Sequence, residues 1–257
     1  MLILEVVNLK KYYGDRLIIS IDDLKIQNGD KIGIVGENGA GKTTLLNILS
    51  GEINPDTGVI KRYSSAAYIK QFSDENMNDQ GKLFKEFGVN DKFNCQKASG
   101  GERAKLSIAA ELSKNSSFLL ADEPTSNLDY RSIKVLKEKL SKVETIVLIS
   151  HDRAFMDAIC NKIIEIRNGK LFFYNGNYSF YKKQKNLKIK RQKMEYEEYI
   201  LEKARLEKAI SDRQGESKSM KKAPKRMGNS EARLHKGKVS EKKKKLDSTV
   251  KRIKSRI

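Results

Sequence analysis

One glycine-rich segment restricts the fold of this chain more than any other feature of its sequence. The segment Gly36-Glu-Asn-Gly-Ala-Gly41-Lys42-Thr43 follows a short β-branched run, Lys31–Val35, and precedes a stretch of helical character, Thr43–Leu49. Glycines let backbone N–H groups turn toward phosphate oxygens, and the dipole of a helix that starts at the loop favours the same negative charge. A strand, this loop and a helix, in that order, predict an α/β fold that binds a nucleotide through its phosphates.

Two side chains of this segment carry the chemistry of a phosphate-binding loop. Lys42 has the position that reaches the β- and γ-phosphates, and the hydroxyl of Thr43 has the position that ligates Mg²⁺. We therefore expect ATP and Mg²⁺ as ligands. The nucleotide-binding residues predicted in this segment are Gly36, Asn38, Gly39, Gly41, Lys42, Thr43 and Thr44.

A second motif lies at the end of an apolar run, where Phe118-Leu-Leu-Ala leads into Asp122 and Glu123. A strand ending there would hold the carboxylate of Asp122 at the edge of the sheet, near the metal. Glu123 would accept a proton from the attacking water or orient it, which is the general-base role in phosphoryl transfer. An isolated Asp-Glu pair is more often a solvated turn. The apolar run before it, and Pro124-Thr-Ser-Asn-Leu-Asp129 after it, favour the catalytic interpretation.

A third motif, Ser99-Gly100-Gly101-Glu102, precedes a predicted helix over Arg103–Leu112. With the other motifs, in this order, it resembles the ATP-binding cassette superfamily over about residues 1–178. The resemblance rests on the glycine-rich loop, Gln71 after an apolar strand, Ser99–Glu102, Asp122-Glu123, Ser126-Asn-Leu-Asp129, and His151 in Ile149-Ser-His-Asp.

The resemblance implies roles that the motifs do not show by themselves. Tyr13 would stack on the adenine ring, with the neighbouring Tyr12 as the alternative and a plain strand-end aromatic as the third interpretation. Gln71 would contact Mg²⁺ and the lytic water, and His151 would hold the γ-phosphate and the general base. The predicted catalytic residues are thus Glu123, His151 and Gln71, and the predicted metal ligands are Thr43, Gln71 and Asp122.

The resemblance also implies that the chain supplies only one half of each site. Ser99 and Gly101 would bind the γ-phosphate of an opposing cassette's ATP, so Ser99, Gly100, Gly101 and Glu102 form a signature that acts in trans. Asp129 belongs to the adjoining segment, the D-loop. Each motif occurs once in the sequence. We therefore expect a second cassette, either in another chain or in a C-terminal half that is missing here.

The charge of the chain divides it into two parts. The formal net charge is +19 over 257 residues, yet residues 1–178 hold 25 Lys and Arg against 23 Asp and Glu. Residues 179–257 hold 27 against 10, a composition that favours a polyphosphate or an anionic membrane surface as partner. Apolar residues recur there at intervals of seven, which predicts two helices packed as a hairpin. These apolar positions are Leu187, Met194 and Leu201 in the first helix and Val239, Leu246 and Ile253 in the second.

The predicted fold class is α/β, a P-loop ATP-binding cassette domain followed by a long basic antiparallel helical hairpin. The cassette would cover residues 1–178, with a short helical subdomain at about 72–115. The hairpin would cover residues 179–257, with its tip at about 211–227. Strands alternating with helices in the first part predict a mainly parallel sheet with helices on its faces.

Three features resemble class F of the superfamily, whose members act on ribosomes. They are the terminal Glu102 of the signature, the sequence Gly176-Asn-Tyr178-Ser-Phe-Tyr181 before the basic helix, and the cationic hairpin itself. The resemblance implies the ribosome as partner, through ribosomal RNA and transfer RNA. The predicted RNA contacts are Lys218, Lys221, Lys222, Lys225 and Arg226. The short interval between Gln71 and Ser99 resembles the antibiotic-resistance branch of this class.

Two other functions remain open from the sequence. A soluble ATPase subunit of a membrane transporter, working as a homodimer, accounts better for the single cassette and worse for the cationic hairpin. A DNA-repair type of ATPase fits the short, proline-broken hairpin poorly. No apolar run is long enough to span a bilayer, and Met1–Glu5 lacks the charged leader of a secretion signal. With Cys95 and Cys160 expected as reduced thiols, we predict a cytoplasmic protein.

Overall fold

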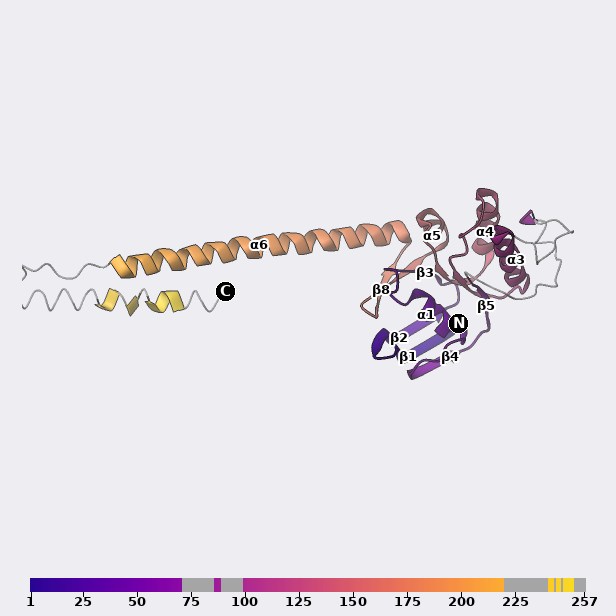
Figure 1. Cartoon of the computed structure of the whole chain (residues 1–257), viewed down its shortest axis with the longest axis horizontal. Coiled ribbons are helices and arrows are strands. Elements are labelled where there is room, and N and C mark those ends of the chain that lie inside the picture. Colours follow the sequence, from indigo (N-terminus) through magenta and orange to yellow (C-terminus); the bar gives the residue numbers. More distant parts are fainter. Residues whose placement is uncertain (71–85, 89–98, 220–239, 243, 246, 252–257) are drawn as a thin grey trace, which may run out of the picture. The chain divides into compact units, whose positions relative to one another are not determined.

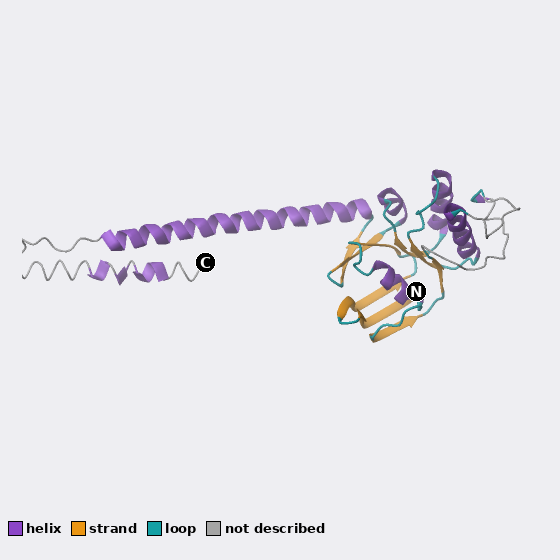
Figure 2. Cartoon of the chain, viewed as in Figure 1, coloured by secondary structure: helices purple, strands orange, loops and turns teal. Residues whose placement is uncertain are grey.

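The computed structural model describes residues 1–70, 86–88, 99–219, 240–242, 244–245 and 247–251. Two compact units are present, Met1–Gln184 and Lys185–Ile257, and each is considered by itself. Within the described residues, no helix combines the length and apolar character that crossing a membrane requires. Figures 1 and 2 show the elements and their secondary structure.

A six-stranded sheet forms the centre of the first unit, and its neighbouring strands are parallel except for the last one. Helical connections between parallel strands cover both faces of such a sheet, and its central runs Phe118–Asp122 and Thr145–Ile149 are buried at every residue. The predicted mainly parallel sheet is therefore confirmed. In sheet order the strands are β5 (Ala66–Ile69), β6 (Phe118–Asp122), β7 (Thr145–Ile149), β3 (Lys31–Gly36), β8 (Lys162–Arg167) and β9 (Lys170–Asn175).

The two faces of this sheet belong to two separate cores. Successive side chains of a strand point to opposite faces. In β6, Phe118 and Leu120 pack into one core, whereas Leu119 and Ala121 pack into the other. Helix α1 (Lys42–Ser50) belongs to the first core, and burial of a side chain such as Leu45 contributes about 2 kcal/mol. Helices α3 (Gly100–Ser113), α4 (Tyr130–Lys142) and α5 (Arg153–Ile159) contribute to the second core.

A second sheet, which the sequence analysis did not predict, completes the first core. It is antiparallel, with strand order β2 (Arg16–Gln27), β1 (Leu2–Tyr13) and β4 (Thr57–Arg62). Helix α1 lies between the two sheets (Figure 1). The pairing of its strands depends on contacts between segments about fifty residues apart, such as Val6 with Ile60. The periodicity of a single segment does not indicate which distant segment it pairs with.

Two helices also differ from the expectation. Helix α5 was not predicted, because its seven residues follow directly on the His151 motif. Helix α3 begins at Gly100 instead of Arg103, because Ser99 caps it and the glycines form its first turn. The pattern Ser-x-x-Glu is a known capping signal, so the earlier start was readable from the sequence.

The long helix α6 (Tyr178–Ser219) runs from the end of the first unit into the second. Its predicted apolar seam is largely solvent-exposed in the structure: Leu187 and Met194 are each 51% exposed, and Leu201 is 70% exposed. The described residues between 240 and 251 are helical, and Val250 is buried among them. Antiparallel packing of the two predicted helices stays a prediction. Residues 220–227 of the predicted tip, and most of the subdomain at 72–115, lie outside the described residues.

Candidate functional site

The phosphate-binding loop joins the end of β3 to the start of α1, as the sequence predicted. Gly41 has φ = 97°, and a Cβ atom added there would lie 2.8 Å from Ile18 Cγ2 of β2. Only glycine fits that position, because both the backbone angle and the neighbouring side chain exclude a larger residue. The ammonium group of Lys42 donates to the carbonyl oxygens of Gly36 and Glu37, at 3.0 Å each. These two hydrogen bonds hold the ammonium group of Lys42 against the start of the phosphate-binding loop.

Asp122 and Thr43 meet beside this loop. Asp122 is the last residue of β6 and is 3% exposed. Burial raises the pKa of its carboxyl group, while a hydrogen bond with the Thr43 side chain and the charge of Lys42 act in the opposite direction. Hydroxyl and carboxylate oxygens are the ligands that Mg²⁺ prefers, together with water and substrate phosphates. The Thr43 hydroxyl and the Asp122 carboxylate therefore fit a Mg²⁺ that is shared with a bound nucleotide.

Glu123 occupies an unusual backbone conformation directly after β6. Its φ is 49°, and its N–H donates to the carbonyl oxygen of Ile149 in β7 at 2.9 Å. Left-handed backbone is uncommon for a residue with a side chain and concentrates at functional sites. The turn is closed by Ser126, whose N–H and hydroxyl both donate to the Glu123 carbonyl oxygen, at 3.0 and 2.7 Å.

The carboxylate of Glu123 is oriented by His151. The backbone N–H of His151 donates to Glu123 Oε2 at 3.0 Å, and its Nε2 atom lies 3.4 Å from Oε1. Oε1 is buried and, among the described residues, accepts no hydrogen bond. A buried carboxylate oxygen with unused acceptor capacity fits a general base that takes a proton from a further donor.

The remaining predicted nucleotide contacts are placed less tightly. Tyr13 ends β1 and is 52% exposed, on the hairpin whose second strand carries Ile18 against the loop. Tyr12 is also exposed, and its N–H donates to Asp56. Both aromatic alternatives therefore remain. Asn38 and Gly39 lie at the exposed turn of the loop, Thr44 lies in the first turn of α1, and Gln71 lies outside the described residues.

The signature forms the exposed N-terminus of α3. Ser99 is its cap, with the Ser99 N–H and hydroxyl donating to Glu102 Oε2 at 2.9 and 2.7 Å. These two bonds hold the pKa of the Glu102 carboxyl group below its usual range. A Cβ atom at Gly101 would lie 2.9 Å from the carbonyl oxygen of Asn127, so the signature and the D-loop are in close backbone contact. N–H groups at a helix start provide an anion-binding surface.

Lys105 is a residue of this region that the sequence analysis missed. Its ammonium lies 2.5 Å from Asp129 Oδ2, and Asp129 also accepts from the N–H of Ser132 as the cap of α4. Mainly because of Lys105, and then because of the hydrogen bonds with Ser132, the pKa of the Asp129 carboxyl group lies well below its usual range. Lys105 follows the signature by one helical turn, and that spacing is the signal that could have found it.

The fold and the site together define an ATP-binding cassette. A family model described as "ABC transporter" matches residues 20–126. The energy-dependent translational throttle protein EttA of Haemophilus influenzae is 34% identical over 213 residues, covering 71% of this chain and 38% of the relative. The ribosome protection protein VmlR of Bacillus subtilis is 34% identical, covering 76% of this chain and 37% of the relative.

Similarity to solved structures supports the same fold. A structure titled "Structure of ATP binding subunit of ABC transporter" has a TM-score of 0.60 at 20% identity, covering 67% of this chain and 90% of that one. The chain belongs to class F of the ATP-binding cassette family, as the terminal Glu102 of the signature and the basic segment after the cassette predicted. It spans a little over a third of the length of the two curated relatives named above.

Proposed function

We propose that this chain binds and hydrolyses ATP as one half of a two-cassette unit and engages the ribosome through its basic linker, protecting the ribosome against antibiotics. One observation carries the ATPase part of the proposal. The ends of the adjacent strands β3, β6 and β7 bring Lys42, the Thr43–Asp122 pair and the Glu123–His151 pair to one edge of the sheet. Ligands of open α/β sheets bind at that edge.

Each group has a separate task in this mechanism. Lys42 exchanges its two loop carbonyls for the β- and γ-phosphate oxygens of ATP. Thr43 and Asp122 would hold a Mg²⁺ ion, whose charge stabilises the phosphates when it is bound. Glu123 Oε1 accepts a proton from the attacking water, and His151 keeps that carboxylate in place.

The signature in this proposal serves another cassette. Ser99, Gly100 and Gly101 are exposed or half-exposed at the start of α3, and Asp129 stands beside them. The γ-phosphate of an ATP bound to a partner cassette would accept hydrogen bonds from these signature residues. We therefore expect the chain alone to bind ATP and to hydrolyse it weakly.

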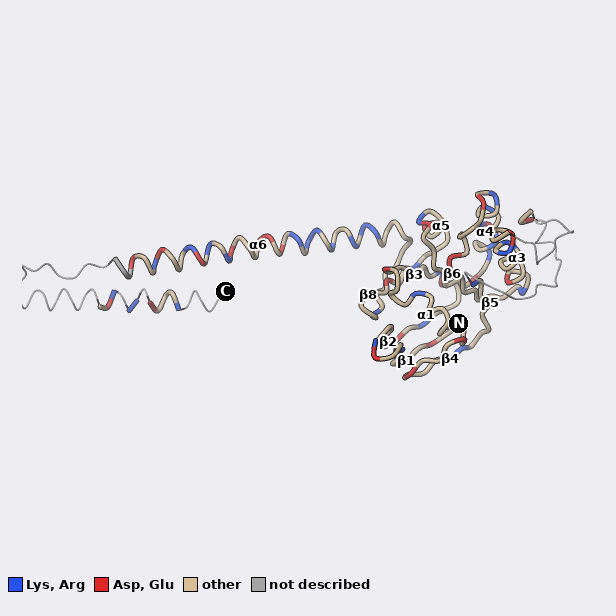
Figure 3. The backbone as a smooth tube through the Cα atoms, in the orientation of Figure 1, with Lys and Arg blue, Asp and Glu red and all other residues tan. Residues whose placement is uncertain are grey.

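The linker part of the proposal rests on charge and on the relatives. Seven Lys and Arg and no Asp or Glu lie between residues 182 and 193 of α6, whereas both signs alternate farther along (Figure 3). Basic helices of this kind bind phosphate backbones in a salt-dependent way. The relatives' names refer to translation and to ribosome protection. The predicted RNA contacts at Lys221, Lys222, Lys225 and Arg226 lie outside the described residues, and Lys218 lies in the last turn of α6.

Co-sedimentation with ribosomes tests the proposal. In the Glu123→Gln variant ATP is bound but not cleaved, so we expect this variant to pellet with ribosomes in ATP and to be released as salt is raised. Lys42→Ala, which loses the phosphate contact, is the matched control and should stay in the supernatant. Binding to detergent-solubilised membrane proteins without ribosome binding would instead support the transporter subunit.

A further inference from the structure

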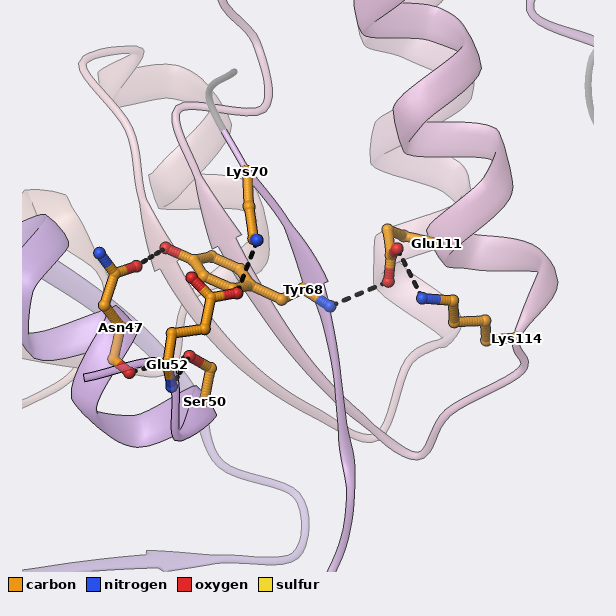
Figure 4. A network of polar contacts seen from close by, with 7 residues as sticks. All are labelled: Asn47, Ser50, Glu52, Tyr68, Lys70, Glu111 and Lys114. Carbon is orange, nitrogen blue, oxygen red and sulfur yellow. Dashed lines mark hydrogen bonds and ion pairs between the residues drawn. The ribbon is translucent and has the colours of Figure 1, made fainter. Parts of the chain in front are cut away.

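A network of polar contacts connects the two helices that carry the phosphate loop and the signature (Figure 4). At its centre is Tyr68, on the edge strand β5. Its hydroxyl donates to Asn47 Oδ1 of α1 at 2.7 Å, and its backbone N–H donates to Glu111 Oε2 of α3 at 3.0 Å. Tyr68 therefore bonds one helix with its side chain and the other with its backbone.

The bond between the Tyr68 N–H and Glu111 joins a backbone group of the edge strand to a mostly buried carboxylate. An edge strand presents N–H groups that no neighbouring strand satisfies, and Glu111 satisfies one of them from the adjacent helix. The Glu111 side chain is only 13% exposed, and its other oxygen lies 2.6 Å from Lys114. A charged acceptor in such a position makes a stronger hydrogen bond than a neutral one.

A second contact attaches β5 to the end of α1. The ammonium of Lys70 lies 2.7 Å from Glu52, which is two residues beyond the end of α1, and 5.9 Å from the centre of the Tyr68 ring. The pKa of the Tyr68 hydroxyl is raised by burial first, and then by the carboxylates of Asp122 and Glu52. The phenol is therefore protonated throughout the neutral range and remains a donor to Asn47.

We propose that Tyr68 is a positioning residue that couples the phosphate-loop helix α1 to the signature helix α3. The inference rests on the proposed function, since it presumes that ATP binds at Lys42. Asn47 is five residues from Lys42 on α1, and Glu111 lies on the helix that starts with the signature. Any adjustment of α1 to a bound triphosphate is thereby passed to α3, which presents Ser99 and Gly101 to a partner cassette.

Hydrogen exchange of the full chain tests the coupling, at a concentration where sedimentation shows it to be monomeric. In the parent chain we expect ATP to slow exchange in the first turn of α3 by about fivefold, a typical size for coupling between sites. Tyr68→Phe keeps the ring and removes the donor, so the slowing should fall below about twofold. The ATP affinity of this variant, measured in the same samples, should stay within about threefold of the parent's.

Tyr174→Phe is the matched control, because it also removes a half-buried tyrosine hydroxyl, one that donates to Glu165 at 3.2 Å in the β8–β9 pair. It should retain the parent's response. Asn47→Ala removes the same bond from the other side, and adding Tyr68→Phe to it should cause no further loss if both act through one contact.

The outcomes separate the inference from the function on which it rests. If Tyr68→Phe responds to ATP as the parent does, or if the parent binds ATP without any change in α3, the coupling is refuted while the ATPase proposal stands. If the parent fails to bind ATP, the affinity measurement refutes the proposed function, and the inference with it.

Discussion

The two surfaces that would touch ATP, the phosphate-binding half and the signature half, hold their carboxylates in opposite ways. Asp122 is 3% exposed and has a raised pKa because of burial. The Asp129 side chain is 56% exposed and has a lowered pKa because of Lys105 and the Ser132 N–H. The first half is therefore organised by the core around it. The second is organised by local caps and remains open to a partner.

The largest expected effect is a loss of ATP affinity when the phosphate-binding half alone is altered. In Lys42→Ala, ATP affinity should fall about 100-fold, since two charge-assisted hydrogen bonds of about 1.5 kcal/mol each are lost. Binding of a fluorescent ATP analogue measures this. Lys61→Ala, which removes only a surface contact to Glu5 at 3.5 Å, is the control and should bind normally. An affinity within about twofold of the parent's in Lys42→Ala would contradict the assigned role.

A smaller effect is expected from the signature half. Lys105→Met keeps the length of the side chain and removes the ion pair between the signature helix α3 and Asp129 of the D-loop. ATP affinity should be unchanged, whereas ATP-dependent association of Glu123→Gln chains should weaken about tenfold. Analytical ultracentrifugation measures the association.

Lys139→Met is the control for Lys105→Met, because it removes an ion pair of similar geometry, with Glu86, at the other end of α4. Association should be unaffected in that variant. Equal weakening in both variants would mean that Lys105 acts only through general stability.

The smallest effect concerns pH and distinguishes the two kinds of carboxylate. The folded pKa of Asp129 is lowered, so its ionised form stabilises the fold above the unfolded value of about 4, and this contribution is lost as pH falls through the folded value. Asp129→Asn can still cap α4 but does not titrate. The stability difference between parent and variant should therefore be present near neutrality and shrink in acid.

Urea unfolding at a series of pH values measures this difference. Asp122 has the opposite sign: its raised pKa means that stability falls as pH rises through the interval above about 4. Asp122→Asn should therefore remove a dependence of stability on pH whose sign is opposite to that of Asp129. If the stability of the two variants depended on pH in the same way, the proposed difference between the two carboxylates would be wrong.

Much of the fold and of the phosphate-binding half could be predicted from the sequence. The strand before the phosphate loop was predicted over Lys31–Val35 and is observed over Lys31–Gly36, and the loop itself was recognised from its glycines and Lys42. These features are local: an apolar run, a turn and a helix start lie within about fifteen residues of one another. Local patterns of this kind are what sequence periodicity reports.

The parts that were missed depend on contacts between distant segments. Glu111 is 43 residues from Tyr68, and Lys105 is 24 residues from Asp129. The left-handed φ of Glu123 arises from its bond to Ile149 on the neighbouring strand. The sequence around Tyr68 and Glu111 does not indicate that the two residues meet, because a strand-end aromatic and a helical glutamate are common in any α/β domain.

The sequence by itself determined which groups are available: one phosphate loop, one acidic pair, one signature and a basic linker. Their chemistry depends on residue type and short spacing, which the chain carries in linear form. Only the tertiary structure decided which groups meet, that Glu123 Oε1 is buried beside His151, and that Tyr68 joins α1 to α3. Those features follow from how parallel strands align their ends and how helices pack on them. That alignment is a property of the folded chain as a whole.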